Sequence, residues 1–153
     1  MIKHIERLKQ ELIEISEMQN NKPIIPICVD FDGTVVTHEY PLVGQENDNC
    51  SEILKRWIDE YNVGIILDTM RSGDTLKDAI KWFEERNVPL YGIGKHPTQN
   101  KWTESNKSYG IFSIDDRNVG VPMKYDLGIG RVDWQRVCDI LEPKLKELNM
   151  KNA

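Results

Sequence analysis

The stretch that decides the fold covers residues 24–34 and reads IIPICVDFDGT. Its first half is a continuous apolar run, which is typical of a strand buried on both faces of a parallel sheet. Asp30 and Asp32 follow directly, and Gly33 lets the chain turn away from the strand. Open α/β sheets bind ligands in the crevice outside the carboxyl ends of their strands. The stretch therefore predicts a strand that delivers two carboxylates to a site.

Two carboxylates this close repel each other, and both stay ionised only beside a compensating charge. A hard divalent cation, which prefers oxygen ligands, is the expected partner. A lone Asp-x-Asp after a strand is more often a simple turn. The metal interpretation therefore depends on further acidic and basic groups at the ends of later strands.

Length and composition indicate one globular domain. The 153 residues suffice for a core without disulfides or a structural metal. Charged residues make up 29% of the chain, and the net charge of −5 gives no basic footprint for nucleic acid, although a local basic patch is compatible with it. Three widely spaced cysteines predict reduced thiols. The charged start and the lack of a long apolar run predict a cytoplasmic protein without membrane contact.

Strand-like and helix-like segments alternate along the chain. The strands expected after the first are 63–67, 88–93 and 109–114, with a short edge strand at 125–127. The expected helices are 1–20, 51–61, 74–86 and a last helix from about 133, which Pro143 is expected to kink or break. This alternation favours a Rossmann-like, doubly wound, mostly parallel sheet with helices on both faces.

Less regular segments separate these elements. Residues 35–44 indicate a short hairpin or flap over the end of the first strand. Residues 94–105 indicate a polar loop, with a turn of helix expected near 104–108. Asn47 and Asp48 offer caps for the helix at 51–61.

The N-terminal helix carries one apolar stripe, made of Ile2, Ile5, Leu8, Leu12, Ile15 and Met18. We expect this stripe to dock beside a matching stripe of the C-terminal helix, because the connection to the first strand is short. A contact with a second subunit is the alternative, since the spacing also suits a coiled-coil seam. A monomer is therefore favoured, with a dimer as the alternative.

Three predicted strands end in reactive groups at one edge of the sheet. These groups are Asp30 and Asp32, then Thr69, then Asp115 and Asp116, with Lys107 just before the last strand. Each alone is weak evidence, because such residues are commonly turns, caps or solvated side chains. Their order and their shared sheet edge favour one common site.

This set resembles the motifs of the haloacid dehalogenase (HAD) superfamily of aspartate-nucleophile phosphatases. The matched positions are Asp30-Phe31-Asp32-Gly33-Thr34, then Thr69, then Lys107, then Ile114-Asp115-Asp116. The resemblance covers residues 24–122 as the motif-bearing core of a single domain of residues 1–153. It leaves the helices at 1–20 and 131–150 outside. Lys101 is a rival of Lys107 for the third motif.

The resemblance implies a phosphoric monoester hydrolase that works through an aspartyl phosphate. Asp30 would attack phosphorus, which splits one difficult displacement into two easier ones. Asp32 would protonate the leaving oxygen and later activate water. Thr69 and Lys107 would hold the oxygens of the phosphoryl group.

The same resemblance implies a Mg²⁺ cofactor. Asp30, the main-chain carbonyl of Asp32, and Asp115 would hold the ion, which keeps several of its waters. Asp116 would hold a metal-bound water or Lys107 rather than the metal. The expected substrate-binding residues are Gly33, Met70 and Arg71.

Family members gain cap domains by insertion after the first motif or between the second and third. Here both intervals are too short for a sizeable cap, and capless members often act on large substrates or use a partner chain as a lid. The residues expected near such an opening are His38, Glu39, Tyr40, Arg71, Lys95, His96 and Trp102. For each of them a solvated loop residue is the alternative.

Two other functions are alternatives. A binding or scaffolding module would keep the fold and lack turnover. A receiver-like phosphoacceptor domain also gathers acidic residues, a Thr and a Lys at a sheet edge. The order of the motifs disfavours the receiver, because Asp-x-Asp-Gly-Thr comes first and the Asp pair last. The sequence predicts a phosphorylated substrate without identifying it.

Overall fold

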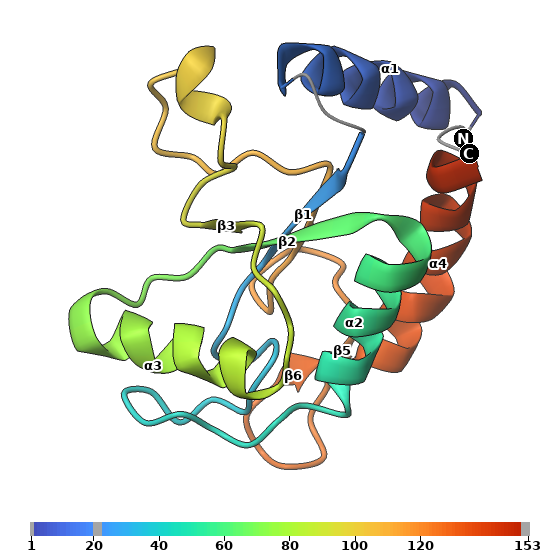
Figure 1. Ribbon diagram of the computed structural model, residues 1–153. Coiled ribbons are helices and arrows are strands. Elements are labelled where there is room, and N and C mark those ends of the chain that lie inside the picture. The colour runs from blue at the N-terminus through green and yellow to red at the C-terminus, as the bar shows by residue number, and fades with distance from the viewer. Residues whose placement is uncertain (1, 20–22, 151–153) are drawn as a thin grey trace.

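The computed structural model describes residues 2–19 and 23–150, and within them the chain has an α/β fold with four α-helices around a parallel sheet (Figure 1). In chain order the elements are α1 (Ile2–Gln19), β1 (Ile25–Val29), α2 (Cys50–Tyr61), β2 (Val63–Leu67), α3 (Gly73–Glu85), β3 (Gly92–Ile93), the 3-10 turn η1 (Gln99–Lys101), β4 (Phe112–Ile114), β5 (Met123–Lys124), β6 (Arg131–Val132) and α4 (Trp134–Met150). The predicted α/β class is confirmed.

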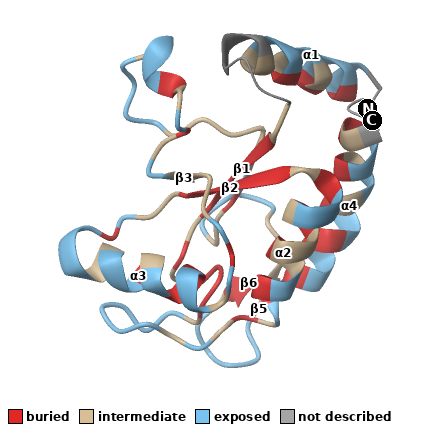
Figure 2. Cartoon of the chain, in the orientation of Figure 1, coloured by how far each residue is buried: buried red, intermediate tan, exposed pale blue. Residues whose placement is uncertain are grey.

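The central sheet has four parallel strands in the order β3-β2-β1-β4. β1 lies between β2 and β4, with Ile27 opposite Ile65 on one side and Phe112 on the other. Every residue of β1 and β2 is buried (Figure 2), which confirms the two apolar runs as core strands. Because β1 is central, the residues that follow it emerge between the ends of β2 and β4.

Two predicted strands are shorter than expected. β3 is confined to Gly92–Ile93 because the Val88 amide still closes the end of α3, donating to the Phe83 carbonyl at 3.0 Å. β4 begins at Phe112 because the amide of Tyr109 donates to the side chain of Gln99 at 3.0 Å. A buried glutamine thus replaces the sheet partner of this amide.

The predicted strand at 125–127 is wrong. Residues 125–128 form the turn between β5 and β6, closed by a hydrogen bond from the Gly128 amide to the Tyr125 carbonyl. β5 and β6 pair antiparallel, with Met123 opposite Val132. The helical turn expected near 104–108 lies instead at η1.

The helix boundaries agree with the prediction to within one or two residues, but the predicted caps of α2 are wrong. The residue before α2 is Asn49, which is left-handed at φ 60° and makes no side-chain cap bond. The Asn47 side chain is not a cap, because it donates to the carbonyls of Thr34 and Val132. α4 continues through Pro143, so the break that was one of the two expected outcomes does not occur, whereas the kink stays a prediction.

α1 packs against α4 near the two ends of the chain (Figure 1). The buried residues of its stripe are Ile5, Leu8 and Leu12. They belong to the same core cluster as Leu145 and Leu148 of α4. Ile15 is half-buried, and the side chains of Ile2 and Met18 lie outside the described residues. The predicted docking of the N-terminal helix on its own chain is confirmed.

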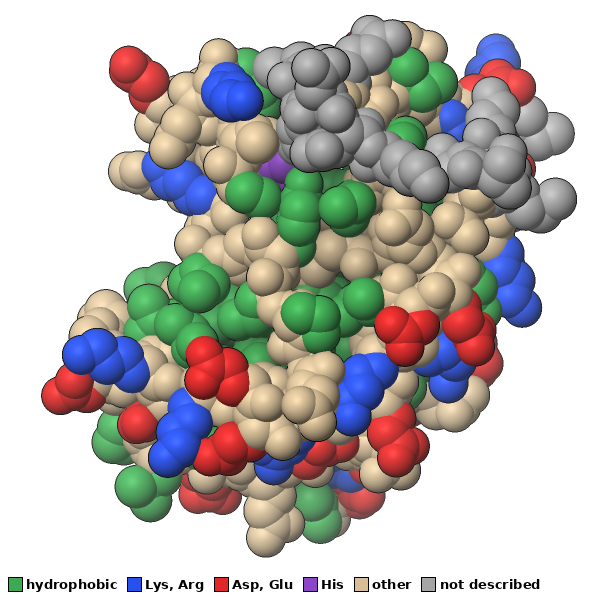
Figure 3. Space-filling view, in the orientation of Figure 1, with side chains coloured by type: hydrophobic (Ala, Val, Ile, Leu, Met, Phe, Trp, Pro, Cys, Tyr) green, Lys and Arg blue, Asp and Glu red, His purple; other side chains and the backbone are tan. Residues whose placement is uncertain are grey.

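The surface shown in Figure 3 carries apolar side chains between α3 and the segment that leads to β3. A hollow there is lined by Ile80, Phe83, Val88, Pro89, Leu90 and Ile93 among others.

The three cysteines are free and buried. Among the described residues, no helix combines the length and the apolar character that a membrane crossing requires.

Candidate functional site

A cavity of about 630 Å³ lies at the carboxyl ends of β1, β2 and β4. It is lined by Asp30, Asp32, His38, Tyr40, Asp68, Thr69, Met70, Arg71, Asp115, Asp116 and Arg117. Parallel strands end at the same edge of a sheet, so residues far apart in the sequence meet there. The predicted set is thereby brought to one place, with the exceptions of Gly33 and Lys107.

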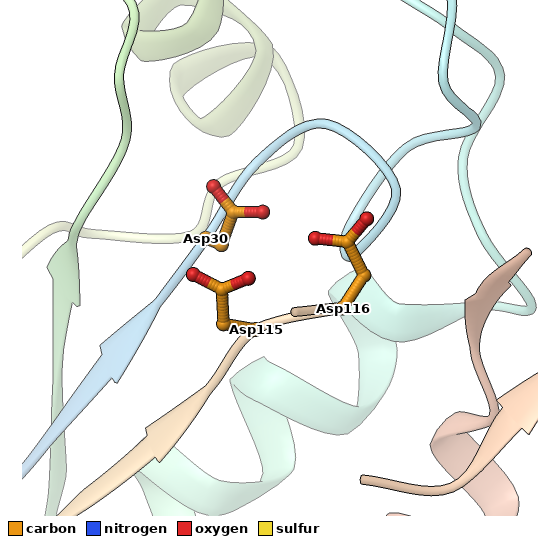
Figure 4. A group of neighbouring side chains, drawn as sticks. All are labelled: Asp30, Asp115 and Asp116. Carbon is orange, nitrogen blue, oxygen red and sulfur yellow. The ribbon is translucent and has the colours of Figure 1, made fainter. Parts of the chain in front are cut away.

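Three of the carboxylates that line this cavity lie close together (Figure 4). We call Asp30, Asp115 and Asp116 the acidic wall. Each contributes an oxygen, and these oxygens all lie within 4.8 Å of one another. Asp30 comes from the end of β1 and the other two from the end of β4. A set of carboxylate oxygens at this spacing fits a hard divalent cation such as Mg²⁺.

Thr34 and Gly33 join the two halves of the acidic wall. The buried Thr34 hydroxyl donates to Asp30 Oδ2 at 3.1 Å and accepts from the Asp116 amide at 3.1 Å. Gly33 has φ 78°, and a Cβ there would lie 2.4 Å from Asp116 Oδ2. Both its amide and its carbonyl bond to other main-chain groups. Gly33 therefore makes room for Asp116, and the predicted substrate contact has no free main-chain group to use.

The acidic wall lacks positive charge. No lysine or arginine in the described part of the chain forms an ion pair with it. Burial, followed by the negative charge of Asp115, raises the pKa of Asp30 to about 8. Burial also raises the pKa of Asp116. A bound divalent cation would supply the missing charge, so the donor set and its electrostatics both fit such an ion.

Asp32, two positions after Asp30 in the chain, has a different partner. Its two carboxylate oxygens accept from Arg71 Nε at 2.8 Å and from Arg71 Nη2 at 2.7 Å. The Arg71 side chain is 1% exposed. The Asp32 carboxylate therefore lies outside the acidic wall. Its predicted metal role rests on the main-chain carbonyl alone.

Arg71 has no hydrogen-bond donor left for a substrate. Beyond Asp32, its Nη1 donates to the carbonyls of Pro41 and Thr75 at 3.3 and 3.2 Å, and its Nη2 donates to Leu42 at 2.8 Å. With Nε, these bonds use all five N–H groups of a guanidinium. In this conformation the residue instead holds parts of the site together, and its role in substrate binding stays a prediction.

The predicted lysine does not reach the cavity. Lys107 is exposed in the segment before β4, and no ion pair joins it to Asp30 or Asp116 in the described residues. Its rival Lys101 is exposed at the end of η1 and does not line the cavity either. Arg117 does line it, and the described residues show no ion pair to its guanidinium.

Thr69 and Met70 lie where they were predicted. The Thr69 hydroxyl accepts a hydrogen bond from the Arg71 amide at 3.1 Å, which leaves its own hydrogen available. The Met70 side chain is 91% exposed at the cavity mouth. Thr69 therefore has a donor to offer to an anion, whereas Met70 contributes an apolar rim.

The residues expected near the opening divide into two groups. His38 and Tyr40 line the cavity, but Glu39, Lys95, His96 and Trp102 do not. His96 is buried in its own loop, with its ring against Tyr91 and Tyr109.

Asp68 also lines the cavity, although it was not predicted to belong to the site. Burial, followed by the charge of Asp115, raises its pKa. Its position in the sequence could have indicated that it belongs to the site, because it follows β2 directly, as Asp30 follows β1.

Comparison with known proteins gives the family of the chain. No protein-family model matches it, and no curated protein does. A solved structure of a conserved protein from Bacteroides thetaiotaomicron is similar, with 32% sequence identity over 79% of this chain and 92% of that one, and a TM-score of 0.65. The chain belongs to the same family as that protein. Because its description states no activity, the function has to be inferred from the site.

Proposed function

We propose that the chain is a Mg²⁺-dependent phosphoric monoester hydrolase of the HAD type that works through an aspartyl phosphate. The observation that carries the proposal is the acidic wall. Asp30 from β1 meets Asp115 and Asp116 from β4 at the carboxyl edge of a parallel sheet, and their oxygens lie within 4.8 Å. These are the positions that match the first and last motifs of the superfamily.

The strand order supports the finer description of the fold. From β1 the chain moves outward to β2 and β3 and then returns to the other side of β1 as β4. This reversal defines a switch point beside β1, where doubly wound sheets bind ligands. The segment after β1 contains only isolated bridges before α2, and α3, β3 and η1 are the elements between Thr69 and Lys107. Both intervals are consistent with a capless enzyme.

The proposed reaction begins at Asp30. One of its carboxylate oxygens attacks phosphorus, and the bond from phosphorus to the leaving oxygen breaks as the acyl phosphate forms. Asp32 gives the leaving oxygen the proton that it took from water in the preceding turnover. As the carboxylate paired with Arg71, it then takes another proton from the water that attacks the acyl phosphate. Inorganic phosphate leaves and Asp30 is restored. A bound Mg²⁺ would offset the charge shared by the acidic wall and the phosphoryl group.

Thr69 and Arg117 are the residues placed to hold the phosphoryl oxygens. Thr69 has a free hydroxyl hydrogen, and Arg117 is a cation at the same cavity. The sequence-based assignment of this role to Lys107 stays a prediction, because Lys107 would have to move inward from its exposed position. His38, Tyr40 and Met70 form the outer part of the cavity, where the leaving group would lie.

The proposal is tested with p-nitrophenyl phosphate and the purified chain. We expect phosphate release with Mg²⁺, loss of release with EDTA, and recovery when Mg²⁺ is added back. If the chain binds Mg²⁺ but releases no phosphate from this ester or from a panel of phosphomonoesters, the proposal fails. The alternative of a binding module then holds.

A further inference from the structure

Residues 37–46, which we call the flap, lie between β1 and α2, and two of them, His38 and Tyr40, line the cavity. The base of the flap is closed by Thr37 and Gln45. The Thr37 amide donates to the Gln45 carbonyl at 2.8 Å, and the Gln45 amide donates to Thr37 Oγ1 at 3.0 Å. This base is a local hairpin, so it does not by itself fix how the tip of the flap lies over the site.

The tip of the flap is fastened by Arg71. Two successive carbonyls of the flap, those of Pro41 and Leu42, accept hydrogen bonds from the guanidinium. The ring of Tyr40 also stacks on it, with Arg71 Cζ 5.2 Å from the ring centroid. The same guanidinium holds both oxygens of Asp32. The Arg71 side chain thus connects the flap to Asp32, which lines the cavity.

The two sides of this connection differ in rigidity. On the core side, the guanidinium lies 4.9 Å from the ring centroid of Phe31, which is fully buried, and it donates to the Thr75 carbonyl of α3. On the outer side its contacts are flap residues such as Leu42, whose side chain is 72% exposed. Movement is therefore expected on the flap side, with Arg71 as the fixed part.

We infer that Arg71 is a positioning residue that couples the flap to Asp32. The flap cannot lift without breaking hydrogen bonds to the guanidinium that orients Asp32, and buried donors left unpaired are costly. Opening the cavity for substrate therefore loosens Asp32, and closing it sets Asp32 in place. The expected benefit to the reaction rests on the proposed function, in which Asp32 protonates the leaving oxygen.

The coupling itself can be tested without activity, by amide hydrogen exchange in the metal-free chain. The probe is the Leu42 amide, which is bonded to the Glu39 carbonyl at 2.9 Å within the flap. Arg71→Lys keeps the charge but loses the planar fork. Asp32→Asn removes one acceptor of the pair. We expect each to speed exchange at Leu42 by about tenfold, as the loss of roughly one hydrogen bond would. Asp30→Asn is the matched control and should leave the rate unchanged.

The consequence for the reaction is tested with two esters. p-Nitrophenyl phosphate has a good leaving group that needs little proton transfer, whereas phenyl phosphate needs more. Arg71→Lys should lower kcat for phenyl phosphate by roughly ten- to a hundredfold, part of the contribution of a positioned acid, and kcat for p-nitrophenyl phosphate far less. Arg86→Gln, which disturbs the ion pair of Arg86 with Glu46 at the base of the flap, should not change this ratio.

The outcomes separate the inference from the proposed function. Unchanged exchange at Leu42 in both Arg71→Lys and Asp32→Asn overturns the coupling, whatever the activity. Faster exchange with an unchanged ratio of the two esters overturns its role in positioning Asp32. Faster exchange in the two variants, together with a wild-type chain that hydrolyses neither ester, supports the coupling and removes the phosphatase.

Discussion

Asp30 and Asp32 follow the end of β1 with one residue between them, yet the charges around their side chains are opposite. Asp30 faces the carboxylates of Asp115 and Asp116, whereas Asp32 lies in the fork of the Arg71 guanidinium. One half of the Asp-x-Asp pattern therefore lacks a counter-charge, and the other half has one within the chain. Uncompensated negative charge is therefore found at Asp30 and not at Asp32.

The division follows from the strand end that each residue faces. The Asp30 amide still donates to the Ile114 carbonyl of β4 at 3.0 Å, so Asp30 stays in register with the strand that Asp115 follows. Asp32 lies beyond that last sheet bond, in the turn, and its side chain meets Arg71 from the end of β2. The order of strands in space, rather than spacing in the sequence, assigns the two carboxylates to different partners.

The largest expected effect comes from removing the uncompensated carboxylate. Asp30→Asn should lower kcat by at least about 10³-fold, as loss of a nucleophile does in other enzymes, because the attacking oxygen is lost. The fold should persist, since an amide of the same shape relieves the crowded charges. Steady-state kinetics with p-nitrophenyl phosphate measures the loss. Asp74→Asn, at a fully exposed side chain of α3, is the control. Activity near wild type in the Asp30 variant would remove Asp30 as the nucleophile.

A mutation in α1 tests whether the site is independent of this helix. Leu8 is 2% exposed in the shared core, so Leu8→Ala should lower the free energy of unfolding by about 2–5 kcal/mol. Ile13→Ala, at a residue that is 38% exposed, should cost much less. Urea denaturation gives both values. Mg²⁺ affinity should stay the same in both variants, and a change in Leu8→Ala would show that α1 shapes the acidic wall.

Gly33→Ala tests the join between the two halves of the acidic wall. The left-handed backbone alone should cost about 1–2 kcal/mol, and the contact of the new Cβ with Asp116 adds to this. Gly120→Ala is matched, because Gly120 has φ 85° and a Cβ added there would have nothing within 4 Å. We expect a larger loss of stability and of Mg²⁺ affinity at Gly33. Equal losses at the two glycines would mean that Asp116 moves aside freely.

The last prediction concerns pH. Because the pKa of Asp30 is raised to about 8 in the folded chain, its contribution to stability is complete below about pH 4 and is lost as the pH rises toward 8. In EDTA, the stability of wild type relative to Asp30→Asn should therefore fall between pH 4 and pH 8. Mg²⁺ should reverse this fall. Thermal denaturation of both proteins across this range measures the difference in stability between them. If that difference does not change with pH, Asp30 is ionised without a cation.

The sequence predicts the frame of the site well. β1 and β2 are continuous apolar runs, and a fully buried strand requires such a run whatever its neighbours are. Asp30 and Asp115 follow their strands directly and Thr69 is the second residue after β2, so a parallel sheet brings them to one edge. These predictions depend on local pattern alone.

The parts that fail depend on contacts between distant residues. The Arg71 guanidinium bonds to Asp32, Pro41 and Leu42, which are about thirty to forty positions earlier in the chain, and nothing near Arg71 in the sequence signals them. Similarly, the start of β4 depends on a hydrogen bond between Tyr109 and the side chain of Gln99. Such side-chain hydrogen bonds compete with the main-chain hydrogen bonds of helices and strands. Which of the two forms depends on contacts that exist only in the folded chain.

The position of a bound metal tests the role of the acidic wall most directly. A crystal of the wild-type chain grown with Mn²⁺, a substitute for Mg²⁺ that scatters anomalously, locates the ion without reference to activity. We predict one anomalous peak in contact with carboxylate oxygens of Asp30 and Asp115, with the ion pair of Asp32 and Arg71 intact. A peak on the Asp32 carboxylate with Arg71 displaced, or no peak at the acidic wall under saturating Mn²⁺, would contradict this assignment.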